Sequence, residues 1–237
     1  MSNKNMMTAE LLIRFSKSSL VNASELLAEA TLLHDNGRYA RAYFLSVACI
    51  EEAGKALMAF DAQGRNLADP AVCTKLRKQM ECHASKIRYA LGVAAARDPN
   101  PKVALESALR LIHALRNGRE PSMYCDLLPD QDRVVVPSEA VRPVASADCL
   151  RLATFSIKYA QQHVINHTPV KVSIEQDKLF LMKPSNLDRI MNLEDFWWFC
   201  ISQLQDGVSD VGKIILAYEK DYILNNKLFR SASVGEG

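Results

Sequence analysis

The sequence is poor in the residues that interrupt regular structure, because it holds only 9 glycines and 9 prolines among 237 residues. Such a chain is not collagen-like, and its 49% content of hydrophobic residues argues against disorder. The length is ample for a buried core. We therefore expect an ordered, helix-rich globule.

An excess of charge of either sign is also missing, since 29 basic residues stand against 27 acidic ones. Net charge therefore does not indicate a nucleic-acid or membrane partner, and such a function would need a local patch. Long hydrophobic runs are absent too, because apolar stretches such as 42–50 are far too short to cross a bilayer. We expect no membrane partner.

The six cysteines are widely spaced and form no C-x-x-C pair. The chain has no HExxH motif, no cysteine–histidine zinc pattern and no Glu-x-x-His pair of the di-iron bundles. We therefore expect no metal and no cofactor. Free thiols without a recognisable signal peptide indicate a reducing compartment, so we expect a cytoplasmic protein.

Apolar residues recur at helical spacing in successive segments that end at turn residues. A first helix is predicted to end at Asn36-Gly37, and the later predicted helices cover 38–63, 70–97, 102–117, 147–167 and 193–224. Short turns between the early helices are typical of an antiparallel bundle. The predicted fold class is therefore all-α, an antiparallel helical bundle with additional C-terminal helices.

Residues 118–146 interrupt the helical pattern with four prolines and a strand-like run, RVVV, at 133–136. We predict a long loop there. For the domain organisation we predict a helical core over 1–130 and a C-terminal helical extension over 131–237 that packs on the same domain. The tail 230–237 is expected to be disordered.

One polar segment, ACIEEAGKAL at 48–57, lies inside an otherwise apolar helix. Its helical offset from the neighbouring apolar residues points Glu51 inward, where a carboxylate needs a partner, a proton or a wet cleft. Lys55 is near enough to pair with Glu51 or Glu52, and Gly54 indicates the close approach of another element. Both a structural ion pair and a functional site in a helix interface account for the segment.

Residues 22–57, NASELLAEATLLHDNGRYARAYFLSVACIEEAGKAL, resemble the amino-terminal signature of the AbiV abortive-infection proteins, a bacterial anti-phage group within the HEPN superfamily. HASK at 83–86 is similar to the family's H-x-x-K, and REPSMYCD at 119–126 to its R-E-x-x-hydrophobic-Tyr-x-Asp. The resemblance covers about residues 15–130. It implies a HEPN-like helical bundle that forms a homodimer and acts when phage infects the cell.

Many superfamily members are metal-independent ribonucleases with an Arg-x4-6-His motif and a polar residue from another helix. The resemblance therefore implies an antiviral effector that acts on RNA or the translation machinery, as a HEPN-like ribonuclease or an RNA-binding toxin. Arg77 and His83 have the spacing of the motif but lie earlier than it usually does. Arg119 has no histidine four to six residues beyond it, and Tyr124 occupies that neighbourhood.

Metal-free RNA cleavage needs a base for the 2′-hydroxyl, a proton donor for the leaving oxygen and cations for the phosphorane. Side chains of these types make up our candidate catalytic set, which is Glu51, Glu52, Lys55, His83, Lys86, Arg119, Tyr124 and Asp126. Basic side chains on the third predicted helix are our candidates for RNA binding, namely Lys75, Arg77, Lys78 and Arg88.

Structural interpretations of the same residues stay open at this point. His83 shares a helical stripe with Leu76 and Ile87, which is compatible with a packed core histidine. Arg119 and Asp126 flank a helix end, where a salt bridge would be sufficient. The basic residues of the third helix would also suit a solvated face.

The alternative function is a non-catalytic helical regulator that binds a phage or host protein and blocks translation. The loop 118–146 and the aromatic helix with Trp197-Trp198 would then form the contact surface. A phage-encoded protein is an expected activator in either case. A third interpretation makes the segment 48–57 a folding element and places function after residue 146.

Overall fold

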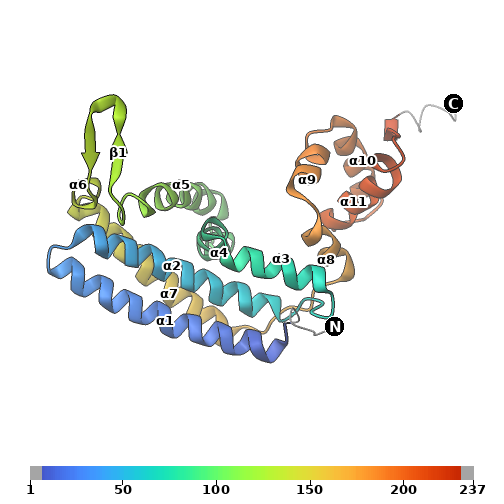
Figure 1. Ribbon diagram of the computed structural model, residues 1–237. Helices are drawn as coiled ribbons and strands as arrows, with labels where there is room; N and C mark the ends of the chain where they lie inside the picture. The colour runs from blue at the N-terminus through green and yellow to red at the C-terminus, as the bar shows by residue number, and fades with distance from the viewer. Residues whose placement is uncertain (1–6, 231–237) are drawn as a thin grey trace, which may run out of the picture. The chain divides into compact units, whose positions relative to one another are not determined.

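The computed structural model describes residues 7–230 and shows a chain of helices with one small hairpin (Figure 1). The longer helices in this part of the chain are α1 (Ala9–Asp35), α2 (Tyr39–Ala62), α3 (Pro70–Glu81), α4 (His83–Ala96), α5 (Pro101–Arg119) and α7 (Pro143–Asn166). The short helix α6 (Pro137–Ala140) directly precedes α7. After α7 the chain forms α8 (Ile174–Leu181), α9 (Pro184–Met191), α10 (Glu194–Gln205) and α11 (Val211–Tyr218), with a π-helical turn at Glu219–Ile223. The all-α fold class is confirmed.

The helices divide into two compact units. Unit 1 comprises the chain up to Gly64 together with Leu76–Val170, and unit 2 comprises Arg65–Lys75 together with the chain from Lys171 onward. The predicted division at residue 130 stays a prediction, while α7 packs with α2 inside unit 1. Residues 231–237 of the predicted disordered tail lie outside the described part of the chain.

The core of unit 1 is built around α2, which packs against α1, α4 and α7. Small residues such as Ala53 and Ala56 are fully buried along α2, so the neighbouring helices approach its backbone closely. Figure 1 shows α1, α2 and α7 running alongside one another for most of their length. This packing explains why a carboxylate at the middle of α2 is buried.

Two helix ends follow from local chemistry that the sequence displays. Thr8 caps α1 by accepting a hydrogen bond from the Leu11 backbone N–H at 3.1 Å. Beyond the last turn of α1, Gly37 adopts a φ of +73°, a left-handed conformation in which glycine carries no side-chain penalty. The helix end predicted at Asn36-Gly37 is therefore confirmed.

The long loop predicted over 118–146 is correct in part. The segment does interrupt the helices, but it also contains a β-hairpin. Its strands are β1 (Asp126–Leu128) and β2 (Arg133–Val135), paired antiparallel with Asp126 opposite Val135. A 3₁₀ turn at Pro129–Gln131 joins them, and Asp132 there has a positive φ of 45°. The strand-like RVVV run thus forms the second strand.

Three predicted segments are wrong in their boundaries. The single helix over 70–97 is two helices, because Cys82 adopts an extended backbone between α3 and α4. Residues 168–192, between two predicted helices and without a predicted helix of their own, contain α8 and α9, and Ser173 caps α8 with a capping box. The helix over 193–224 is interrupted where Gly207 turns at a φ of +86° and Asp210 caps α11.

Unit 2 has an aromatic core of its own, in which the ring of Tyr218 contacts the rings of Phe196 and Phe199. The segment that opens unit 2 is fixed by Asp177, which accepts hydrogen bonds from the Arg65 side chain at 2.7 Å and from the Asn66 backbone at 3.0 Å. Within the described residues, no helix combines the length and apolarity that crossing a bilayer demands.

Candidate functional site

Three predicted site residues contact the buried carboxylate of a fourth, Glu51, in unit 1. We call them the Glu51 cluster, and its members are Glu51, His83, Lys86 and Arg119. Nδ1 of His83 and Nζ of Lys86 each lie 2.7 Å from Oε2 of Glu51. Nε of Arg119 donates to Oε1 at 3.2 Å. The cluster thus joins α2, α4 and the end of α5.

A close approach of α4 to α2 makes these contacts geometrically possible. A side chain on Gly54 would overlap the carbonyl oxygen of Lys86 and lie 2.8 Å from its carbonyl carbon. The extended backbone at Cys82 makes His83 the first residue of α4, from which its ring reaches Glu51. Gly54 therefore has the close-approach role that its place in the helix predicts.

Arg119 is held at the end of α5 by contacts on several sides. Its guanidinium lies over the Phe44 ring, 5.0 Å from the centroid, and it also contacts the exposed carboxylate of Glu120. The neighbouring Gly118 lets the Tyr43 hydroxyl approach, because a Cβ there would lie 2.5 Å from that oxygen. Phe44 is a member of the site that the sequence did not single out.

The charges around Glu51 keep it ionised despite its burial. Burial by itself would raise the pKa of Glu51, but hydrogen bonds from Lys86 and His83 and the positive charge of Lys86 outweigh that effect. The pKa of Glu51 therefore lies below its ordinary value. The side chains of Glu51 and Lys86 are 5% and 6% exposed, so this pair is largely shielded from water.

The side chain of His83, in contrast to those of Glu51 and Lys86, is 53% accessible to solvent. It is therefore not a packed core histidine. An ionised carboxylate only accepts hydrogen bonds, so the short contact assigns the proton of the neutral ring to Nδ1. Nε2 is then the basic nitrogen, and a buried carboxylate holds the ring in place. This arrangement suits a general base.

The remaining candidates lie outside the cluster. Lys55 pairs with Glu52, and not with Glu51, one helical turn along α2. Tyr124 is 59% exposed, and Asp126 is an exposed residue of β1 whose Oδ1 accepts from the Leu127 backbone. Arg119 forms its ion pairs with Glu51 and Glu120, so the alternative of a salt bridge to Asp126 is not what the structure shows.

The four candidate RNA-binding residues have different surroundings. Lys75 belongs to unit 2, donates to the Met182 carbonyl at 3.0 Å and faces the Phe180 ring. Arg77, Lys78 and Arg88 are exposed residues of unit 1. The predicted strip therefore keeps three of its cations at the surface of the unit that holds the Glu51 cluster.

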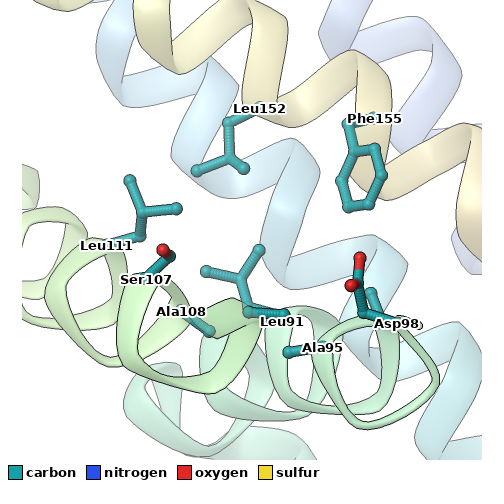
Figure 2. Close-up of a pocket in the computed structure, with 10 residues that line it drawn as sticks. Leu91, Ala95, Asp98, Ser107, Ala108, Leu111, Leu152 and Phe155 are labelled. Atoms are coloured by element: carbon teal, nitrogen blue, oxygen red, sulfur yellow. The ribbon is translucent and has the colours of Figure 1, made fainter. Parts of the chain in front are cut away.

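A pocket elsewhere in unit 1 differs from the cluster in chemistry. It has a volume of about 140 Å³. Leu91, Leu111 and Leu152 converge on it from α4, α5 and α7 (Figure 2). Its only charged lining residue is Asp98, so it has no cation for a phosphate. Among the described residues, no three of the side chains His, Cys, Asp and Glu are grouped to hold a metal ion.

Comparison with known families gives one match. The family model HEPN_AbiV, described as AbiV, matches residues 11–158, more than half of the chain. The matched range contains the whole Glu51 cluster and ends before α8 begins. No curated protein and no solved structure matches the chain.

Proposed function

The chain belongs to the AbiV family of HEPN proteins, and on that basis we propose that it is an abortive-infection effector that cleaves RNA at the Glu51 cluster. The observation that carries this proposal is a half-exposed histidine held by a buried carboxylate, with a lysine and an arginine beside it. They supply the base and the cations that metal-independent phosphodiester cleavage requires, and water supplies the proton for the leaving oxygen.

The cluster supplies a base and two cations for a transfer within the RNA strand. Nε2 of His83 takes the proton of a 2′-hydroxyl, and the 2′-oxygen attacks the adjacent phosphorus. The bond from phosphorus to the 5′-oxygen breaks, the 5′-oxygen receives a proton from water, and the product is a 2′,3′-cyclic phosphate. Glu51 holds the ring tautomer, and Lys86 and Arg119 offset the charge that gathers on the phosphorane.

Cleavage of a defined single-stranded RNA by the purified full chain tests this function. The reaction is run with EDTA, and the products are examined for 2′,3′-cyclic phosphate and 5′-hydroxyl ends. We expect His83→Ala to lower the rate about 100-fold or more, because general base catalysis contributes that much. Arg119→Ala should lower it by a comparable factor through lost charge stabilisation.

His113→Ala is the matched control, because His113 is an exposed histidine of α5 whose contact is with Asn117 at 2.8 Å. It should cleave at the wild-type rate. The same variants in bacteria challenged with phage should show protection by wild type and His113→Ala and none by His83→Ala. Equal cleavage by wild type and His83→Ala would remove the cluster from catalysis.

A second candidate function rests on an exposed apolar face of α10. Trp197, Trp198, Ile201 and Leu204 are 44–49% exposed there. We propose this face as the contact surface if the protein acts by binding a phage or host protein. Trp198→Ala would then abolish capture of that protein from infected cells while His83→Ala retains it.

We further propose that the protein works as a cytoplasmic homodimer and that a phage-encoded protein activates it. The support is the family membership, together with the exposed face of α10. Light scattering of the purified chain gives the oligomeric state directly. Cross-linking during phage infection identifies an activator.

A further inference from the structure

A second pocket in unit 1 adjoins the Glu51 cluster through a shared lysine. It measures about 480 Å³, a size typical of small-molecule sites. Lys86 lines this pocket and also donates to Glu51 at 2.7 Å, while Glu51 binds His83 on the same oxygen. Lys86 therefore links the pocket to the cluster that holds the proposed base.

The pocket has one apolar wall and one charged side. The wall comes from the first turns of α1, with Leu11 and Phe15, and from Met80 of α3. Phe15 is 39% exposed and Leu11 is 44% exposed, so the wall is open to solvent. The charged side is lined by Lys55, Arg77 and Lys86 and by the carboxylate of Glu81, while Lys55 also pairs with Glu52 and Lys86 with Glu51.

This combination selects for a ligand with a flat apolar body and an adjacent negative charge. A nucleobase stacks on an aromatic ring, and its neighbouring phosphate is attracted by lysine and arginine. The open wall suits a base that is carried on a longer strand, whereas a fatty acid would need an enclosed apolar channel. A mononucleotide unit of single-stranded RNA therefore fits both sides of the pocket.

We propose that this pocket binds one base of a single-stranded RNA, stacked on Phe15, with the adjoining phosphate at Arg77 and Lys86. The inference rests on the proposed function, because it places the strand that His83 would cut. It assigns α1 a part in substrate selection, and it makes Phe15 a binding residue and not a catalytic one.

Binding of a 2′-O-methyl RNA oligomer separates this inference from cleavage, because the oligomer has no 2′-hydroxyl to react. Fluorescence anisotropy with the full chain should show about tenfold weaker binding for Phe15→Ala. Phe15→Tyr keeps the aromatic face and should bind as wild type does. Ile13→Ala is the matched control, since Ile13 lies on α1, is also 39% exposed and does not line the pocket.

An oligomer with one abasic residue tests whether a base is recognised. The wild-type protein should bind the abasic oligomer more weakly than the intact one. Phe15→Ala should bind both oligomers equally, because it has already lost the stacking contact. Equal affinity of wild type and Phe15→Ala for the intact oligomer, or no binding by wild type, would overturn the inference. Displacement of the oligomer by laurate but not by adenosine monophosphate would identify a lipid-like ligand and overturn it as well.

Cleavage is measured separately on the unmodified RNA, so the two proposals fail independently. If Phe15→Ala weakens binding and no variant cleaves, the pocket assignment stands and the ribonuclease function fails. If wild type cleaves through His83 while Phe15→Ala binds normally, the function stands and the pocket assignment fails.

Discussion

At the scale of single residues, the buried carboxylate of Glu51 organises its surroundings. A buried charge is costly without partners, and Glu51 has three cationic or hydrogen-bonding ones within 3.2 Å. Its inward direction was predictable from the helical repeat of α2. Its partners were not, because His83 and Arg119 are 32 and 68 residues away and only tertiary packing brings them to it.

Glu51→Ala should lower the free energy of unfolding by about 3–5 kcal/mol, because it leaves the buried ammonium of Lys86 without its carboxylate. Chemical denaturation followed by circular dichroism measures this. Glu52→Ala is the control, with an expected loss of about 0.5 kcal/mol or less, because its pair with Lys55 is a partly exposed contact one turn apart. Adding Lys86→Met to Glu51→Ala should restore part of the loss, and additive losses would contradict this account.

His163 should make the stability of unit 1 depend on pH near neutrality. It is buried on α7 and faces Asp61 at 3.8 Å, Arg97, Tyr159 and His167. Burial, followed by the charge of Arg97, lowers the pKa of His163, although Asp61 opposes this. The unfolded chain then binds a proton near the ordinary pKa of about 6.5, where the folded chain does not.

The stabilising contribution is complete above about pH 6.5 and is lost as the pH falls below it. Unfolding measured between pH 7.5 and 5 should show a steeper decrease in wild type than in His163→Gln. The absolute stability of the variant does not matter for this comparison, since only the slopes are compared. Parallel curves would show that His163 binds its proton equally well in both states.

At the scale of elements, the close contact of α2 with α4 sets the geometry of the cluster. Gly54→Ala should destabilise the protein by about 1–3 kcal/mol, because the new methyl group meets the backbone of Lys86 and not a movable side chain. Helix propensity alone would favour alanine by about 1 kcal/mol, so the sign tests the packing. Cleavage should fall as well, since α4 carries His83.

Gly92→Ala provides the matched control for this prediction. Gly92 lies inside α4, and a Cβ there meets nothing within 4 Å. Alanine should therefore stabilise the protein by up to about 1 kcal/mol through helix propensity. Thermal unfolding of both variants measures the difference, and a loss at Gly92 equal to that at Gly54 would contradict the packing argument.

The sequence pattern located the early helices well. It failed where a helix ends without a glycine or proline that marks the end unambiguously. Gly37 marks the end of α1 by its residue type, whereas Cys82 separates α3 from α4 with no glycine or proline at the break. Gly207 interrupts the predicted last helix, but one glycine inside an apolar repeat is also tolerated in helices. His83 was therefore placed mid-helix by the sequence and at a helix start by the structure.

At the scale of the whole molecule, the two units divide the candidate functions. The Glu51 cluster and the 480 Å³ pocket lined by Phe15 lie in unit 1, and the exposed aromatic face of α10 lies in unit 2. The family match ends at residue 158, so it covers most of unit 1 and does not reach α8–α11. Sequence resemblance could therefore indicate the chemistry of the first unit, whereas in the second unit it covers residues 65–75 and none of α8–α11.

Asp177→Ala should loosen unit 2 while leaving unit 1 as it is. Asp177 is 6% exposed and accepts hydrogen bonds from Arg65 and Asn66, so its removal leaves a partly buried guanidinium and a backbone N–H without their acceptor. We expect a local loss of about 1–3 kcal/mol. Hydrogen exchange should become faster in α8 and α11, which pack against each other, and stay unchanged in α2 and α7.

Asp188→Ala, at an exposed position of α9, is the control and should leave hydrogen exchange in both units unchanged. Equally faster exchange in α2 would show that the two units unfold as one, and RNA cleavage by Asp177→Ala would then fall along with it.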